Sequence, residues 1–295
     1  MSKNMSRRSA LRKIGGSAAT LAVAAALPRT STAAEAGAAA KLKGNIRHSV
    51  CKWCYGKVPL DEFCEQAKAM GIEAVDLLGV NEFATLKKYG LVCAMTSGVP
   101  GGINDGLNRV EHHDRIVEFM EKTAPVVAEH GYQNIIVFSG NRKGMSDEQG
   151  LENCATGLKR LVPIAEKHKV VIVMELLNSK RSHKDYMCDH TAWGVQLCKK
   201  VGSENFKLLY DIFHMQIMDG DIIDTIKENS KYFAHYHTGG VPGRAEIDES
   251  QEIYYPAVMK AIVETGFKGF VAQEFVPRRK DVMASLRQAI GICDV

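Results

Sequence analysis

The sequence lacks the spacings that identify several common kinds of binding domain. Its eight cysteines contain one CxxC, formed by Cys51 and Cys54, and neither a second CxxC nor a nearby histidine pair accompanies it. A zinc ribbon is therefore not expected, and a pair of free thiols at the end of a first strand is the better interpretation. No GxGxxG follows that strand, which removes the strongest signal for a dinucleotide-binding domain.

Long apolar runs and a sustained excess of charge are also missing. The alanine-rich run at 18–27 is shorter than a membrane-spanning helix requires. The formal net charge is +4, and several of the lysines and arginines lie within residues 1–35, so the rest of the chain is close to neutral. Without a basic stripe, nucleic acid is not an expected partner. The oligomeric state stays open, a homo-oligomer included.

The amino-terminal part of the sequence has the features of an export signal. Arg7 and Arg8 precede the weakly apolar run at 18–27, and small residues follow at 31–34. This order predicts a twin-arginine signal peptide at residues 1–35, a single domain at residues 36–295 and a periplasmic destination. A disordered basic tail ahead of an alanine-rich helix is the alternative. Export of a folded chain is compatible with free thiols.

From residue 36 onward, short β-branched runs alternate with longer amphipathic stretches. The run at 170–174 is continuously apolar, as in a strand whose two faces are both covered. Eight such units in about 260 residues favour an α/β fold that closes into a single (β/α)8 TIM barrel over an open sheet. The expected strands are 46–51, 74–78, 91–96, 134–139, 170–175, 207–211, 233–237 and 269–274.

Four consecutive strands of this expected barrel end in a residue that can bind a metal. Functional residues of such barrels lie at the carboxyl ends of the strands. A single carboxylate there more often caps a helix or pairs with a basic residue. Placing three carboxylates together, however, lowers the stability of the fold by on the order of several kcal/mol unless a cation or protons neutralise their charge. This donor set predicts one divalent metal ion, Mn²⁺, Mg²⁺, Co²⁺ or Zn²⁺. The four residues are Glu175, Asp211, His237 and Glu274.

The segments around these residues carry a family resemblance. They look like the hydroxypyruvate isomerase and ketose 3-epimerase branch of the xylose-isomerase-like TIM barrels, over essentially all of 36–295. The Asp-x-x-His-Met run is the most specific part of the resemblance, and the Glu after the fifth strand is the least specific. The segments are Met174-Glu175-Leu176-Leu177-Asn178, Asp211-Ile212-Phe213-His214-Met215, His235-Tyr236-His237, Pro242-Gly243-Arg244 and Gln273-Glu274-Phe275.

The resemblance implies a role for each matching residue. The four residues at the strand ends would bind the metal, and Glu175 and Glu274 would also form the acid/base pair on opposite sides of the substrate. His214 and Arg244 would hold substrate oxygens. Some hydroxypyruvate isomerases carry Gln at the position of His237, whereas His there is more similar to the 3-epimerases. The resemblance therefore leaves the substrate open between these two groups.

Two residues after the first strand are further candidates for substrate binding. Lys52 could supply a cation for a substrate carboxylate, and Trp53 could form an apolar wall. A core tryptophan beside a solvated lysine is the alternative reading of the same pair.

The expected activity is isomerisation of a small sugar or hydroxy-keto acid. A metal on adjacent carbonyl and hydroxyl oxygens acidifies the C–H between them, and a carboxylate can then move the proton through a cis-enediolate. Conversion of hydroxypyruvate to tartronate semialdehyde is the first expectation, and inversion at C3 of a ketose is the second. A keto-inositol dehydratase and an exported sugar-binding barrel without turnover remain alternatives. A phosphodiesterase similar to endonuclease IV would need further histidine ligands on earlier strands.

Overall fold

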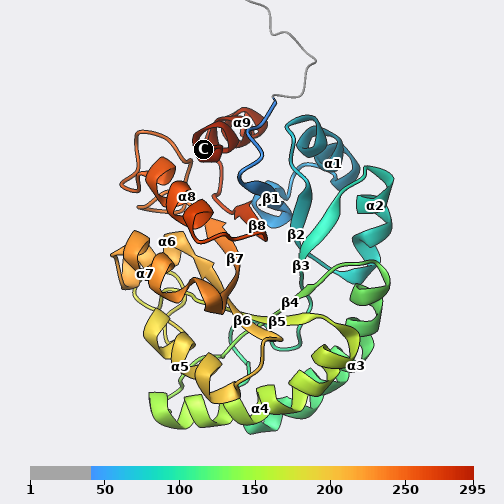
Figure 1. Ribbon diagram of the computed structural model, residues 1–295, viewed down its shortest axis with the longest axis vertical. Helices are drawn as coiled ribbons and strands as arrows, with labels where there is room; N and C mark the ends of the chain where they lie inside the picture. Colours follow the sequence, from blue (N-terminus) through green and yellow to red (C-terminus); the bar gives the residue numbers. More distant parts are fainter. Residues whose placement is uncertain (1–40) are drawn as a thin grey trace, which may run out of the picture. The chain divides into compact units, whose positions relative to one another are not determined.

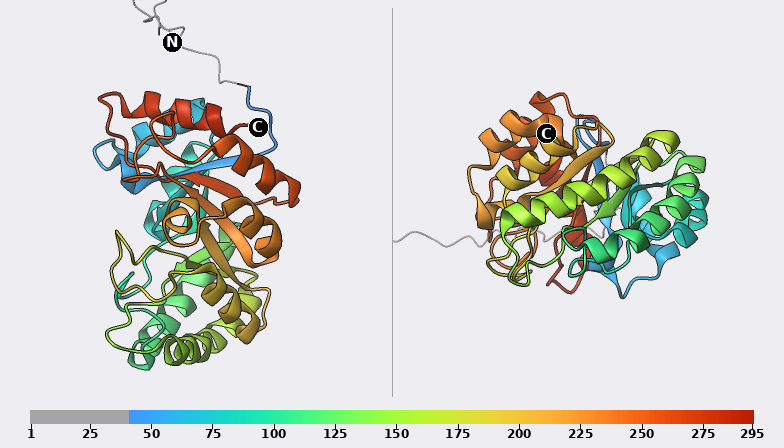
Figure 2. Two further views of the ribbon diagram at one scale, coloured as in Figure 1. Left: turned by 90° about the vertical axis from the view of Figure 1, so that its left-hand side faces the viewer. Right: turned by 90° about the horizontal axis from the view of Figure 1, so that it is seen from below.

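The computed structural model describes residues 41–295, so the predicted signal peptide at residues 1–35 lies outside the described residues. Within them, eight parallel strands pair in sequence order and the last pairs with the first, which closes the sheet. The helices lie around the outside of this sheet (Figures 1 and 2). The predicted single (β/α)8 barrel is therefore confirmed.

The strands fall close to the predicted runs. Strand β4 ends earlier than expected because the chain turns away before Ser139, at which point it no longer pairs with β5. The strands are β1 (Arg47–Cys51), β2 (Ala74–Leu78), β3 (Val92–Thr96), β4 (Asn134–Val137), β5 (Val171–Glu175), β6 (Phe206–Asp211), β7 (Phe233–Thr238) and β8 (Phe270–Gln273).

Some of the helices that cover the sheet begin or end at a residue that caps them. The Ser146 side chain accepts a hydrogen bond from the Gln149 backbone N–H and so caps the start of α4. Gly202, in the left-handed conformation, ends α5. The helices are α1 (Leu60–Ala69), α2 (Phe83–Lys88), α3 (His113–Glu129), α4 (Asp147–His168), α5 (Thr191–Val201), α6 (Ile212–Met218), α7 (Ile222–Asn229), α8 (Tyr255–Glu264) and α9 (Val282–Cys293). None of them has the length and apolar character that crossing a lipid bilayer requires.

An apolar layer fills the inside of the barrel and supports the residues above it. Its members, Met95, Ile136, Val173 and Leu209, come from four consecutive strands and are buried. Side chains two residues apart on a strand point to the same side of a sheet. The positions two residues after Val173 and Leu209 are occupied by Glu175 and Asp211, which therefore lie one layer closer to the carboxyl end of the barrel.

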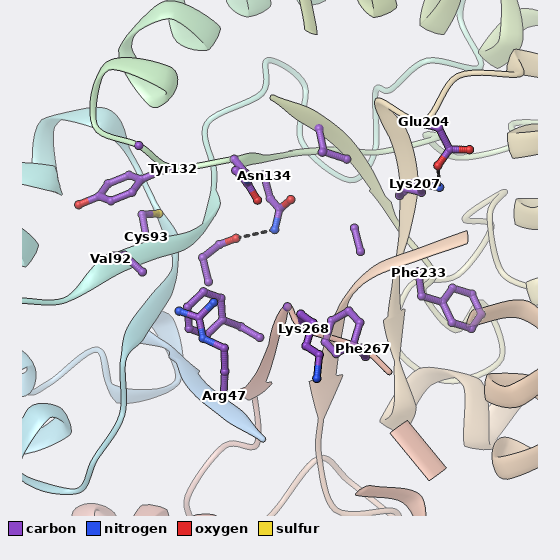
Figure 3. A pocket seen from close by; sticks show the side chains of 17 residues that line it. Arg47, Val92, Cys93, Tyr132, Asn134, Glu204, Lys207, Phe233, Phe267 and Lys268 are labelled. Carbon is purple, nitrogen blue, oxygen red and sulfur yellow. Dashed lines mark hydrogen bonds and ion pairs between the residues drawn. The ribbon is translucent and has the colours of Figure 1, made fainter. Parts of the chain in front are cut away.

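The amino ends of the strands surround a hollow of about 580 Å³ (Figure 3). Most of its charged residues are paired locally: Arg47 lies 3.0 Å from Glu73, and Lys207 lies 2.6 Å from Glu204. The Asn134 side chain donates to the Ala94 carbonyl at 2.9 Å. In barrels of this kind the residues at the amino ends of the strands contribute to stability, whereas functional residues lie at the carboxyl ends.

One tyrosine fastens the long loop after β5 to the carboxyl end of the barrel. The Tyr186 hydroxyl donates to the Glu175 carbonyl at 3.0 Å and accepts from the Ser139 backbone N–H at 3.1 Å. The Ser139 hydroxyl in turn accepts from the Cys188 backbone N–H at 2.9 Å. Tyr186 is fully buried, so this network lies away from water. It joins the ends of β4 and β5 to the loop that follows.

We expect Tyr186→Phe to lower the free energy of unfolding by about 1–3 kcal/mol, because a buried N–H and a buried carbonyl lose their shared partner. Urea denaturation followed by circular dichroism measures the change. Tyr254→Phe is the matched control, since Tyr254 is 74% exposed. Equal stability of the two variants would contradict the anchoring role of the hydroxyl.

Candidate active site

The four predicted metal ligands come together at the carboxyl end of the barrel. Glu175 and Asp211 are the last residues of β5 and β6, His237 lies near the end of β7, and Glu274 directly follows β8. Asp211 pairs in register with His237, and His237 pairs with Ala272 of β8, so consecutive strands deliver the set. Their candidate ligand atoms all lie within 4.8 Å of one another, and all four residues are buried.

His237 lies between the two glutamates. Its Nδ1 atom is 2.6 Å from Glu274 Oε2 and 3.5 Å from Glu175 Oε1. Its other ring nitrogen, Nε2, points away from both and lies 3.4 Å from Asp76 Oδ2. The two nitrogens of one imidazole therefore face two different groups of carboxylates.

Arg244 supplies a positive charge to the same cluster. Its Nη2 atom donates to Asp211 Oδ2 at 2.9 Å and also contacts Glu274 Oε2. Its Nε donates to the Glu274 backbone carbonyl at 3.0 Å. The guanidinium lies near the rings of Trp53 and Phe213, with its central carbon 5.4 and 5.2 Å from their centroids. The residue has φ of 56°, a conformation rare outside glycine, which turns the side chain back over the barrel mouth.

Burial and these cations act on the three carboxyl groups in opposite directions. Burial raises the pKa of Glu175, although the hydrogen bond to His237 opposes the rise. Burial also raises the pKa of Asp211, to about 7, against the opposing charge of Arg244. At Glu274 the effect of burial is outweighed by Arg244 and His237, which hold the pKa well below its ordinary value. The pKa values of the three carboxyl groups thus differ although the groups lie within one cluster.

The imidazole of His237 responds to its acidic surroundings. Burial lowers its pKa, but the acidic groups around it, Cys51, Glu274 and Asp76 among them, outweigh burial and raise the pKa well above the usual value. The short Nδ1 to Oε2 contact is consistent with a proton held between His237 and Glu274. A metal ligand must give up such a proton, so a cation at Nδ1 would take its place.

The donor set fits a single divalent cation. Three carboxylates and one imidazole are the oxygen and nitrogen ligands that Mg²⁺, Mn²⁺, Co²⁺ and Zn²⁺ accept. The charge that a cation would neutralise is balanced here by the guanidinium of Arg244 and by His237. The residues that would hold the ion are Glu175, Asp211, His237 and Glu274.

His214 presents a hydrogen-bond donor to the same space. Its Nδ1 atom accepts from the Asn178 backbone N–H at 3.1 Å, which leaves the proton of the neutral ring on Nε2. Burial and the nearby Arg244 charge hold the pKa of His214 well below its ordinary value, so the ring is neutral. Its Nε2 atom lies 3.0 Å from Arg244 Nη1, so these two nitrogens border the same space.

Comparison with known proteins agrees with this geometry. The model of the xylose isomerase-like TIM barrel family matches residues 64–290. The chain belongs to this family.

Curated relatives of this family member are named as isomerases. The 2-oxo-tetronate isomerase of Cupriavidus necator is 31% identical over 109 residues, which are 37% of this chain and 41% of that protein. The hydroxypyruvate isomerase of Escherichia coli is 28% identical over 138 residues, which are 46% of this chain and 52% of that protein. The matches thus span about half the length of these relatives.

A solved structure supports the fold. The family 2 AP endonuclease of Brucella melitensis superposes with a TM-score of 0.73 at 22% identity, over 82% of this chain and 96% of that one. At this level of identity the likeness concerns the barrel alone.

The structure brings the predicted substrate-binding residues of this family member to the cluster, with the exception of Lys52. Trp53 donates from its indole nitrogen to Glu274 Oε1 at 2.7 Å and remains 49% exposed. The Lys52 amino group turns instead to the Tyr55 carbonyl, 3.1 Å away, and lies over the Phe63 ring. Among the contacts of residues 41–295, Lys52 has none with the four candidate ligands.

Sequence reasoning missed the residues on the far side of His237. Asp76 of β2 lies 2.5 Å from His235 and 3.4 Å from His237, and all three are fully buried. Cys51 Sγ lies 3.7 Å from His237 Nε2. Two signals could have indicated this cluster. One is the charged Asp76 in the apolar run of β2, and the other is the spacing of His235 and His237, which puts both on one face of a strand.

Arg244→Met should lower the free energy of unfolding of the metal-free protein by about 3 kcal/mol, because it leaves two buried carboxylates without their shared partner. Urea denaturation in the presence of EDTA tests this. Arg278→Met is the control, because Arg278 is exposed and its guanidinium contacts the Gly243 carbonyl of the same loop. An equal loss of stability in both variants would show that stability depends on the contacts of the loop and not on the charge of Arg244.

Proposed function

We propose that this protein is a divalent-metal-dependent isomerase of a small hydroxy-carbonyl compound, with hydroxypyruvate as the first candidate substrate and tartronate semialdehyde as its product. One observation carries the proposal. Two buried carboxylates, Glu175 and Glu274, approach His237 Nδ1 to 3.5 and 2.6 Å within a donor set that fits one cation. Binding alone would not require two opposed carboxylates at this place.

The bound ion would supply electrophilic activation, by withdrawing charge from the adjacent carbonyl and hydroxyl oxygens of the substrate so that the C–H between them becomes acidic. The chain's own residues then move the proton. One of the paired carboxylates, Glu175 or Glu274, accepts it from one carbon, and the other returns a proton to the neighbouring carbon, while the substrate hydroxyl gives up its proton and the former carbonyl oxygen gains one. The indole of Trp53 holds Oε1 of Glu274 and thereby fixes the direction of its carboxylate.

Two further residues would hold and orient the substrate. His214 is neutral and carries its proton on Nε2, so it can donate a hydrogen bond to a substrate oxygen. Arg244 offers a guanidinium whose fork of N–H groups matches a carboxylate. Their closest atoms are 3.0 Å apart, so one small substrate can reach both donors.

The surroundings of Arg244 favour an anionic substrate. A hollow of about 640 Å³ lies beside this residue, and Lys180 and Arg181 from the loop after β5 also line it. Glu252 is its acidic member. A cationic lining attracts anions, which favours a hydroxy-keto acid over a neutral sugar. The isomerase names of the curated relatives, one of them hydroxypyruvate isomerase, support the same ranking.

Epimerisation of a ketose at C3 is the second candidate. It rests on His237, since an imidazole at this position resembles the 3-epimerases more than those hydroxypyruvate isomerases that carry Gln there. The same pair of carboxylates would serve, because inversion also removes and returns one proton beside a carbonyl. We further propose that the protein is exported by the twin-arginine route, for which Arg7, Arg8 and the apolar run at 18–27 are the support.

We expect the protein to exchange a hydroxymethyl proton of hydroxypyruvate for deuterium in D2O when Mn²⁺, Mg²⁺ or Co²⁺ is added, and not after treatment with EDTA. Proton NMR measures the exchange and identifies the product. Metal-dependent exchange at C3 of a ketose instead would move the assignment to the epimerases. Absence of exchange with hydroxypyruvate and with a panel of ketoses would contradict the proposed reaction.

Glu175→Gln and Glu274→Gln should each reduce the exchange rate by about 10²–10⁴-fold, because each removes one of the two groups that move the proton. Rates are compared at metal and substrate concentrations that saturate each variant, since both residues are also candidate ligands. Glu252→Gln, in the hollow beside Arg244, serves as the control with a carboxylate outside the donor set. Full activity of either ligand variant would contradict the acid/base assignment.

Asp211→Asn should weaken Mn²⁺ binding by about 100-fold or more. This loss of affinity is larger than the one expected when a residue that only supports a ligand is replaced. The change suits the test because asparagine also caps helices, and the Asp211 side chain accepts a hydrogen bond at the start of α6. Isothermal titration with Mn²⁺ gives the affinity. The matched control is Asp219→Asn, whose carboxylate accepts from the Thr191 backbone N–H. Unchanged affinity in Asp211→Asn would remove this residue from the donor set.

A further inference from the structure

Two buried residues that the proposed reaction does not use meet inside the barrel, one layer below His237. Asp76 Oδ2 lies 2.5 Å from His235 Nε2 and 3.4 Å from His237 Nε2. Strands β2 and β7 are not neighbours, because β8 and β1 separate them in the sheet. The contact therefore crosses the interior of the barrel, in a place with no exposed surface.

The backbone of β2 is irregular where it delivers Asp76. The register between β2 and β3 shifts on both sides of this residue, and the next residue, Leu77, has φ of 61°. Neighbouring side chains of a regular strand point to opposite faces, yet Asp76 contacts the inner histidines while Leu77 packs against the inner apolar layer. A bulge redirects a side chain in this way, and such a φ costs a residue like leucine about 1–3 kcal/mol.

Strand β7 has a second irregularity at the same contact. Leu208 of β6 pairs with Phe233, whereas Leu209 pairs with His235, so β7 carries one extra residue, Ala234, between them. Ala234 also packs against the inner apolar layer, and His235 contacts Asp76. Both partners of the contact are thus directed inward by a local departure from regular pairing.

The position of Asp76 has a chemical consequence for the candidate ligand above it. Nδ1 of His237 faces the donor set, and Nε2 faces Asp76. An imidazole that binds a cation through Nδ1 keeps its proton on Nε2, and a buried N–H needs an acceptor. The Cys51 sulfur, 3.7 Å away, is a weak acceptor, whereas a carboxylate is a strong one.

We propose that Asp76 is a positioning residue for the candidate metal centre: its carboxylate accepts a hydrogen bond from Nε2–H of His237, and the ring of His235 lies directly against that carboxylate. The inference rests on the proposed function in one respect, namely that His237 binds a cation. A carboxylate behind a ligating histidine fixes the ring and raises its basicity. Removal of such a partner costs about 10–100-fold in metal affinity.

Mn²⁺ affinity of Asp76→Asn, measured by electron paramagnetic resonance of the free ion, is the first test. We expect binding about 10–100-fold weaker than in the parent protein. The control is Asp189→Asn, which changes another buried carboxylate that pairs with Arg142 at 2.9 Å and should lower stability while leaving Mn²⁺ affinity unchanged. Parent-like affinity in a folded Asp76→Asn protein would overturn the inference, and so would an equal loss of affinity in the control.

A spectroscopic measurement on the parent protein tests the inference without any change at Asp76. In protein labelled with ¹⁵N-histidine and loaded with Zn²⁺, long-range ¹H–¹⁵N correlations identify the metal-bound and the protonated nitrogen of His237. Its signals are assigned by their loss in His237→Gln. We expect zinc on Nδ1 and the proton on Nε2. Zinc on Nε2 would overturn the inference whether or not Asp76→Asn folds.

The same measurements distinguish an error in the proposed metal centre from an error in the role of Asp76. A parent protein that binds neither Mn²⁺ nor Zn²⁺ would overturn the metal centre and this inference together. A parent that binds both ions and a folded Asp76→Asn protein that binds Mn²⁺ equally well would overturn the role of Asp76 alone, with the proposed metal centre intact.

Discussion

The charge balance of three buried carboxylates is the constraint on which the carboxyl end of this barrel depends. Closing the sheet brings the ends of β5 and β6 and the residue after β8 within a few ångströms, so their negative charges must be compensated. His237 and Arg244 provide the compensation in the described chain. The left-handed conformation of Arg244, the two aromatic rings near its guanidinium and the anchored loop after β5 all help to keep these charged groups in place.

The apolar interior and the polar mouth are built by the same strands. Val173 and Leu209 fill the barrel, and two residues further along the same strands Glu175 and Asp211 face the site. Because side chains alternate along a strand, the same strands form one apolar layer and, directly above it, the layer of candidate ligands. Asp76 and His235 depart from this plan, since they place a charge within the barrel, where Asp76 is close to His235 and His237 while its Oδ1 atom has no hydrogen-bond partner among the described residues.

Much of this architecture could be predicted because it follows from local rules. Continuous apolar runs identified the strands, and the rule that function lies at the carboxyl ends of barrel strands singled out Glu175, Asp211, His237 and Glu274. The charge of Asp76 in an apolar run and the spacing of His235 and His237 mark both strands as unusual. That Asp76 and His235 touch could not be predicted from these signals, because the contact depends on bulges that no turn or glycine signal marks. The outward turn of Lys52 likewise depends on the 3₁₀ turn after β1, whose geometry the sequence does not encode in a recognisable motif.

The shared contacts of Arg244 couple two binding events. One guanidinium serves both Asp211 and Glu274, so a cation that takes their oxygens would release it. A released guanidinium in a largely buried pocket needs a new anion, and a substrate carboxylate is a suitable one. Thermodynamic linkage then makes the cation and an anionic substrate each strengthen the binding of the other. Under the proposed function, cooperativity of this kind would make the site bind the ion and the acid together more strongly than either one alone.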